Sequence, residues 1–189
     1  ATFAAKTLEN EIDRYFQVTK NEAHRPAFIK QLETTLETEK VVTALQQIAA
    51  LGTPAPTHES TAARADLLEI EQQNKLNALL QNQLARYTQP DANSRQPRLA
   101  SMFVTDNRGT IIGIAYQKRV EIKPDENSVS KKFWYRTYFH GGRVDGPKET
   151  TSISESRPIT STPLHDPFQS TATGLWKVAI STPIYLSDE

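Results

Sequence analysis

The pattern of apolar residues changes once along this 189-residue chain, and that change limits what the chain can fold into. Up to about residue 86, apolar residues recur every three or four positions, as they do along one face of a helix. From about residue 97 onward, short apolar runs alternate with turn-forming residues, a pattern typical of strands. Helices followed by antiparallel strands predict an α+β fold. We expect a helical stalk and linker over residues 1–96 and a β-sheet domain over residues 97–189.

Three amphipathic helices are expected in the first part of the chain. An apolar stripe over residues 8–19 predicts the first helix, and Pro26 then interrupts the pattern. A second stripe over residues 28–49 predicts one helix that ends at the Gly- and Pro-containing residues 52–56. A third helix with a leucine-rich stripe is expected over residues 60–84, since a Ser or Thr at its start can cap it.

The second part of the chain is expected to form a hairpin and further extended segments. Residues 99–116 contain two apolar runs joined by a turn, in which we expect Asp106 to accept backbone hydrogen bonds. Further extended stretches are expected within residues 148–159 and 176–184. Residues 128–140 have a mixed pattern that predicts a helix or loop carrying an aromatic cluster.

Composition excludes several classes of protein. Lys and Arg number 22 and Asp and Glu number 22, so the basic surplus of a nucleic-acid-binding protein is missing. The chain has no cysteine, which rules out disulfides and thiolate metal sites. No run reaches the roughly 18 apolar residues that a membrane-spanning helix needs. The chain begins without Met, and we expect it to be a piece cut from a longer protein.

The sequence contains no catalytic signature. Its four histidines lack the spacing of metal ligands, and there is neither a Gly-rich phosphate loop nor a Gly-x-Ser-x-Gly elbow. We therefore predict no catalytic residue, no metal and no cofactor. A hydrolase would require several titratable groups in one cleft, with His140 hydrogen-bonded to both a Ser and an Asp.

The richest segment for binding chemistry is residues 131–141, where five aromatic residues fall within seven positions around Arg136. An arginine can hold a carboxylate through two parallel hydrogen bonds, and aromatic walls exclude water from that contact. The alternative is a core-packing segment in which Arg136 pairs with a structural carboxylate or a backbone carbonyl. The residues alone leave both interpretations open.

The order and spacing of three motifs resemble the Cache family of sensor domains. These motifs are the hairpin over residues 103–113, the aromatic stretch over residues 133–139 and the strand over residues 178–184. The variant present here is similar to the extracytoplasmic part of bacterial, planctomycete-type receptor Ser/Thr protein kinases. The resemblance covers most of residues 1–185.

The resemblance implies a single-Cache domain, in which a PAS-like antiparallel sheet packs on long N-terminal helices around one ligand pocket. On this comparison the domain at residues 97–189 would lack its last strand. Lys131 occupies the position at which amino-acid-binding relatives have a tyrosine, so the amino-acid motif is incomplete. The residues assigned to ligand binding are Trp134, Arg136, Tyr138, Phe139 and, as a candidate for the distal aspartate, Asp166.

The function implied is that of a small-molecule sensing domain on the extracytoplasmic, periplasmic side of a bacterial inner membrane. The ligand would be an organic acid or an amino-acid-like molecule. Membrane helices and an intracellular output domain would flank the chain, and the N-terminal helices would pair in a homodimer. The alternative function is a protein-interaction or structural module that acts through its helices, without a small-molecule ligand.

Overall fold

The protein is described here by a computed structural model that places residues 2–51, 58–87, 99–117, 127–147, 156–170 and 174–186. The elements within these ranges are α1 (Thr2–Ala23), α2 (Pro26–Glu37), α3 (Glu39–Ala50), α4 (His58–Glu69), α5 (Glu71–Ala85), β1 (Ser101–Thr105), β2 (Ile111–Tyr116), α6 (Thr137–His140), β3 (Phe168–Gln169) and β4 (Trp176–Lys177). Strands β1 and β2 form one antiparallel sheet, and β3 and β4 form another. The α+β class expected from the sequence is confirmed.

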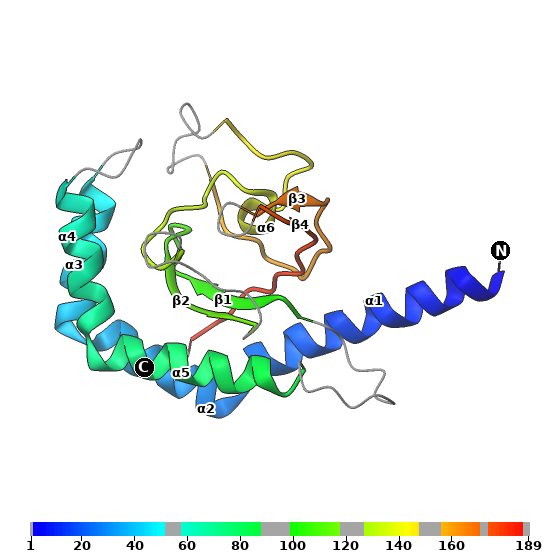
Figure 1. Ribbon diagram of the computed structural model, residues 1–189, viewed down its shortest axis with the longest axis horizontal. Coiled ribbons are helices and arrows are strands. Elements are labelled where there is room, and N and C mark those ends of the chain that lie inside the picture. The colour runs from blue at the N-terminus through cyan, green and yellow to red at the C-terminus, as the bar shows by residue number, and fades with distance from the viewer. Residues whose placement is uncertain are drawn as a thin grey trace.

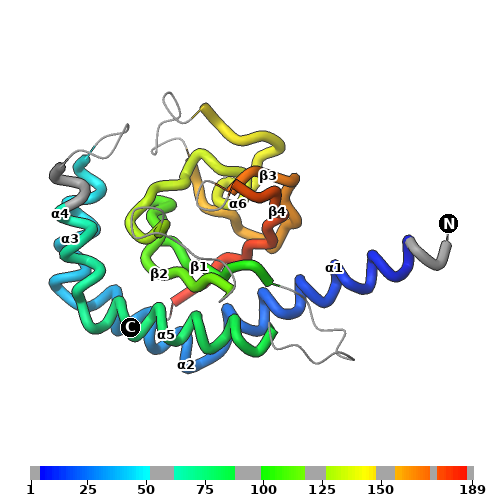
Figure 2. The backbone as a smooth tube through the Cα atoms, viewed as in Figure 1, coloured from blue at the N-terminus to red at the C-terminus, as the bar shows by residue number. Residues whose placement is uncertain are grey.

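The helices surround the β1–β2 hairpin on two sides (Figure 1). Helices α2 and α5 run side by side beneath the hairpin, while α3 and α4 stand as a second pair at one end of it. Helix α1 projects away from the body, and the other face of the hairpin is covered by α6, β3 and β4. The tube in Figure 2 shows the last described residues returning past the hairpin toward α5, where Ile184 and Leu186 pack against the core.

Two predicted helices are each divided in the structure, which corrects the expectation of one helix over residues 28–49 and one over residues 60–84. The first division is at Thr38, where φ is −68° and ψ is 113°, and the second is at Ile70, where φ is −74° and ψ is 126°. These are extended conformations that end the helical hydrogen-bond ladder. The junction expected before Pro26 is confirmed, since α1 ends at Ala23 and α2 begins at Pro26.

Three threonines with side-chain bonds to the backbone lie at the division between α2 and α3. The hydroxyls of Thr34, Thr35 and Thr38 each donate to the backbone carbonyl four residues earlier, at 2.9, 2.7 and 2.8 Å. Such bonds compete with the helix ladder and bend helices. The bend sends the two ends of the predicted helix to different cores, with Phe28 and Leu32 in one and Val41 in the other.

The hairpin forms as the sequence predicts, with Asp106 organising its turn. The Asp106 Oδ1 atom accepts from the backbone N–H groups of Arg108 at 2.9 Å and Thr110 at 2.8 Å. Gly109 has a φ of +76°, a conformation that suits glycine. A Cβ at this position would lie 2.7 Å from the backbone nitrogen of Trp134, so the turn also needs glycine for this close approach.

Helix α5 packs on one face of the hairpin and also satisfies part of its free edge. A Cβ on Gly113 would lie 3.0 Å from the side chains of both Leu76 and Leu80. The helix therefore packs so closely on the strand here that a larger residue would have to displace these leucines. The side chain of Gln73 donates to the Ile112 carbonyl at 3.2 Å. One turn later, Asn77 accepts from the backbone N–H of Ile114 at 3.0 Å. These polar contacts on α5 compensate backbone groups that a further strand would otherwise bond.

The later extended stretches form less sheet than expected. Within residues 176–184, only Trp176–Lys177 is a strand, with a further single bridge between Leu164 and Ile180. Of the stretch at 148–159, residues 148–155 lie outside the described residues, and residues 156–159 form no strand. The described residues thus contain two separate two-stranded sheets in place of one broad sheet.

Helices and hairpin share their hydrophobic cores across the expected boundary at residue 96. One core joins Val41 and Leu67 of the helices to Ile114 and Phe133. The other joins α2 and α5 to the opposite face of the hairpin. Among the described helices, none combines the length and the apolar character needed to cross a bilayer.

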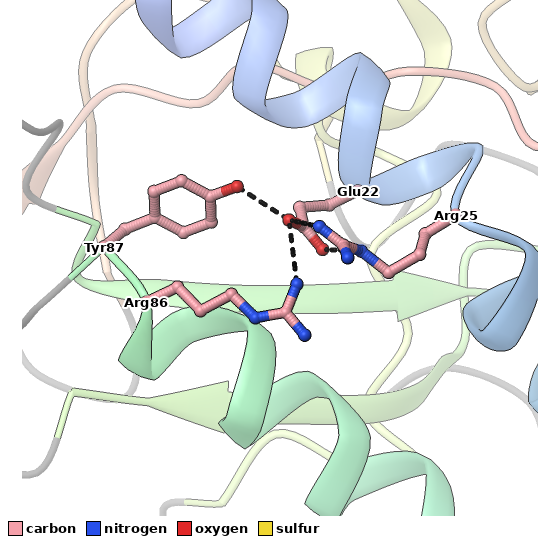
Figure 3. Close-up of polar contacts among 4 residues, drawn as sticks. All are labelled: Glu22, Arg25, Arg86 and Tyr87. Atoms are coloured by element: carbon pink, nitrogen blue, oxygen red, sulfur yellow. Dashed lines mark hydrogen bonds and ion pairs between the residues drawn. The ribbon is translucent and has the colours of Figure 1, made fainter.

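A buried carboxylate fastens α1 to the end of α5 (Figure 3). Glu22 is 4% exposed, and Arg25 donates to its two oxygens at 2.9 and 2.6 Å. The Tyr87 hydroxyl donates to Glu22 Oε1 at 2.6 Å, and Arg86 lies 3.7 Å from the same atom. We call these four residues the Glu22 cluster.

Candidate functional site

The aromatic segment that the sequence singled out lies along the edge of the hairpin. The backbone N–H of Ile111 donates to the Lys131 carbonyl at 3.0 Å, and the backbone N–H of Phe133 donates to the Gly109 carbonyl at 2.8 Å. Lys132 turns away from this edge and donates to the Leu51 carbonyl at 2.6 Å, which caps the end of α3. The segment is thereby held between the β1–β2 hairpin and the α3–α4 pair.

A cavity of about 50 Å³ lies on the face of the hairpin opposite α5. The hairpin provides one wall, residues 128–138 provide the second, and the β3–β4 segment provides the third. The lining residues are Ser101, Phe103, Ile111, Ile114, Tyr116, Ser128, Phe133, Arg136, Tyr138, Phe168, Ser170 and Lys177. The cavity therefore combines apolar walls with three serines and two cationic side chains.

Arg136 lies at the wall of this cavity, held between two rings. Its guanidinium carbon is 5.3 Å from the centre of the Tyr135 ring and 5.5 Å from that of Phe168. Its Nη1 atom donates to Asp145 Oδ2 at 2.6 Å, and the other oxygen of Asp145 accepts from the Thr137 backbone N–H at 2.8 Å. Its Nε atom is buried and has no hydrogen-bond partner among the described residues.

The electrostatics of Arg136 and its neighbour Tyr138 follow from burial. Burial works against the charge on Arg136, but the hydrogen bond to Asp145 and the nearby tyrosines outweigh it and hold its pKa above the usual value. Burial also raises the pKa of Tyr138, so its phenol stays protonated at neutral pH. The cavity wall thus presents a permanent cation beside a neutral hydroxyl.

The five residues assigned from the sequence are not all brought together. Arg136 and Tyr138 line the cavity, and the Tyr138 ring packs against Phe103 and Phe168 at centroid distances of 5.5 and 5.3 Å. Trp134 and Phe139 are buried in the core, 3% and 5% exposed, and neither belongs to the cavity lining. Asp166 is exposed and also lies outside the lining.

Sequence reasoning missed two residues at this place. Asp145, the partner of Arg136, follows the aromatic segment in a stretch without a clear pattern, so no local signal identified it. Lys177 could have been found, because it lies on an alternating stretch on the same side as Ala179, which packs against the core. A lysine at an inward-facing position is unusual enough to indicate a site.

Among the described residues, neither His140 nor His165 is hydrogen-bonded to both a Ser and an Asp, the arrangement that a hydrolase would require. The His140 ring accepts from the Gly142 backbone at 2.9 Å and faces the Tyr135 carbonyl at 3.1 Å, so both of its nitrogens contact backbone. His165 contacts Ser181 at 2.6 Å, and no carboxylate among the described residues hydrogen-bonds to this pair. The described part of the chain also contains no group of three acidic or histidine side chains placed to hold a metal.

The geometry thus provides an aromatic-walled cavity with a buried, partly unpaired arginine and a lysine at its rim. Such a cavity suits a small anion, because it combines aromatic walls with hydrogen-bond donors. Comparisons of this chain with protein-family models, with curated proteins and with solved structures find no match.

Proposed function

We propose that this chain is a sensing domain that binds a small carboxylate-type ligand and belongs to a bacterial transmembrane signalling protein of the receptor Ser/Thr kinase type. The observation that carries the proposal is the buried Nε of Arg136, which finds no partner among the described residues at the wall of a cavity. A buried donor left without a partner costs about 1–3 kcal/mol. A ligand oxygen that reached this nitrogen, by a small movement of the Arg136 side chain, would remove that cost.

The finer fold that we propose is the PAS-like, single-Cache domain, placed on the periplasmic side of the inner membrane. Its basis is the resemblance of the three sequence motifs. Two features of the architecture support it: a hairpin packed on long helices, and a cavity between that hairpin and its covering segments. Membrane anchoring and the output domain would come from flanking segments.

The ligand would have few atoms. The cavity of about 50 Å³ is well below the roughly 300–1,000 Å³ of pockets for drug-sized ligands. It holds more than a single water molecule, which occupies about 30 Å³ in the liquid. Formate, acetate and propionate are the natural first candidates.

A continuous set of contacts leads from the cavity to α1. Ile114 of β2 lines the cavity, and its backbone N–H bonds to Asn77 of α5. The end of α5 carries Tyr87, which binds Glu22 at the end of α1. A ligand that favours one packing of hairpin on α5 would act on α1 through this route, by its differential affinity for the two packings.

A protein-interaction module acting through the helices is the alternative. It would require an apolar patch on residues 28–49 and a filled core near Arg136. Phe28 and Leu32 are each 3% exposed and Val41 is fully buried, which favours the sensing function. A homodimer through α1 remains part of the proposal, since Leu8 in its apolar stripe is 63% exposed.

The test is a thermal-shift titration with formate, acetate and propionate. We expect at least one of these to raise the melting temperature of the wild-type chain, and Arg136→Ala to abolish that rise. Arg143→Ala is the matched control, because Arg143 is exposed and does not line the cavity. Each shift is measured against the variant's own melting temperature. Normal ligand binding by Arg136→Ala would overturn the assignment of the pocket.

A further inference from the structure

At β4 the usual placement of apolar and charged side chains is reversed. Trp176 and Val178 are 72% and 62% exposed, whereas Lys177 between them is half-buried and lines the cavity. Alternate residues of a strand point to opposite faces, and a lysine normally takes the solvent side while apolar residues take the inner side. Here the lysine lines the cavity while the apolar side chains on either side of it face water.

Lys177 is placed against the side chains that surround Arg136. In the β3–β4 ladder it pairs with Phe168, whose ring lies against both Arg136 and Tyr138. Lysine and arginine therefore approach the same cavity from two different segments, the β4 strand and the start of α6.

The two cations differ in how far the protein neutralises them. Arg136 forms an ion pair with Asp145 at 2.6 Å. Lys177 forms no ion pair or hydrogen bond within the described residues, and burial lowers its pKa without a carboxylate to oppose the shift. Among the described residues, the lining contains no Asp or Glu. With Lys177 protonated, these residues give the cavity one excess positive charge.

Resting on the function proposed above, we propose that Lys177 is a specificity-determining residue of the same site. Its ammonium supplies the charge that an anion neutralises, while the guanidinium of Arg136 supplies a hydrogen bond. The site therefore selects a small organic monoanion and rejects an amino acid of the same size. An α-ammonium group would enter a cavity that already holds two cations and whose lining has no carboxylate to receive it.

The experiment compares acetate with glycine, which has the same carboxylate and carbon skeleton plus an ammonium group. Dissociation constants are measured by calorimetry or by ligand-observed NMR, with formate and propionate as further probes. We expect glycine to bind the wild-type chain at least about tenfold more weakly than acetate. The reason is that its ammonium group would lie beside two cations without a carboxylate partner.

Three variants test the residue itself. Lys177→Met keeps the unbranched stem and removes the charge, and it should weaken acetate binding about tenfold or more. Lys177→Arg keeps the charge and should stay within about threefold of wild type. Lys30→Met, on an exposed position of α2, removes one positive charge elsewhere and should change nothing.

The outcomes separate this inference from the function on which it rests. If none of the three carboxylates binds the wild-type chain, the proposed function fails and this inference fails with it. If acetate binds wild type and Lys177→Met equally, or if glycine binds as tightly as acetate, the role of Lys177 is overturned while the proposed function stands. Circular dichroism checks folding, and Lys177→Gln against Lys177→Arg replaces the comparison if Lys177→Met does not fold.

Discussion

Two charged side chains among the described residues, Glu22 and Arg136, have different surroundings. Glu22 is 4% exposed, and Arg25, Arg86 and Tyr87 all surround its carboxylate. The side chain of Arg136 is 14% exposed and has Asp145 on one nitrogen, but its Nε is buried without a partner among the described residues. In the first group both carboxylate oxygens accept hydrogen bonds from protein groups, whereas in the second one buried nitrogen has no partner among the described residues.

This difference separates a structural role from a binding role. A buried charge that is fully hydrogen-bonded fixes the geometry of the elements that carry it. Glu22 does this for α1 and α5, which have few other means of contact. A buried charge with a free donor beside a cavity has capacity left for a ligand. Three further experiments test whether this distinction holds.

The largest effect is expected at Glu22. Glu22→Gln removes the charge on which Arg25 and Tyr87 converge, and should lower the free energy of unfolding by about 2–3 kcal/mol, since the two arginines can partly reach water. Urea denaturation measures the change. The matched control is Glu11→Gln, whose ion pair with Arg14 lies on the surface of α1 and should cost about 0.5 kcal/mol or less. Equal effects at the two positions would contradict the structural role of the cluster.

The second-largest effect is expected at Asp145, whose carboxylate competes with a ligand for the charge of Arg136. Asp145→Asn removes the counter-charge but keeps an oxygen for the Thr137 backbone. Acetate should then bind about threefold to tenfold more tightly, because the cavity gains positive potential. Asp166→Asn is the control, since Asp166 is exposed outside the cavity lining. Weaker acetate binding by Asp145→Asn would mean that Asp145 serves to position Arg136.

The smallest effect is expected at Tyr87. Burial, together with its hydrogen bond to Glu22, raises the pKa of Tyr87 from 10.0 to about 12. The folded state therefore favours the protonated phenol, and this contribution to stability is complete below pH 10 and is lost as pH rises toward 12. Tyr87→Phe should cost about 1 kcal/mol at neutral pH. The stability difference between wild type and variant, measured by denaturation from pH 8 upward, should narrow at high pH. A constant difference would show that the hydroxyl does not bind the carboxylate.

Features set by neighbouring residues could be predicted from the sequence. The hairpin at residues 99–116 was predicted because a turn with Asp106 and Gly109 has local backbone requirements. The junction before Pro26 was predicted for the same kind of reason. The divisions at Thr38 and Ile70 were missed, because an apolar stripe continues across each bend and does not show which core each half will join.

The candidate site was predicted only in part. Arg136 and its aromatic neighbours were found because they are adjacent in the sequence. In the structure Tyr138 lines the cavity and Trp134 is buried in the core. This separation depends on which way each side chain points once the segment docks on the hairpin. Asp145 and Lys177 come from other segments, so no local pattern linked them to Arg136.

The sequence by itself determined the α+β class, the places of most helices and the hairpin, because periodicity and turn chemistry act over a few residues. The tertiary structure decided that Glu22 is saturated while Arg136 keeps a free donor, and that Lys177 faces the same cavity. The physical reason is that part of the surroundings of each charged group, such as Tyr87 at Glu22 and Phe168 at Arg136, comes from distant segments that meet only when the cores pack.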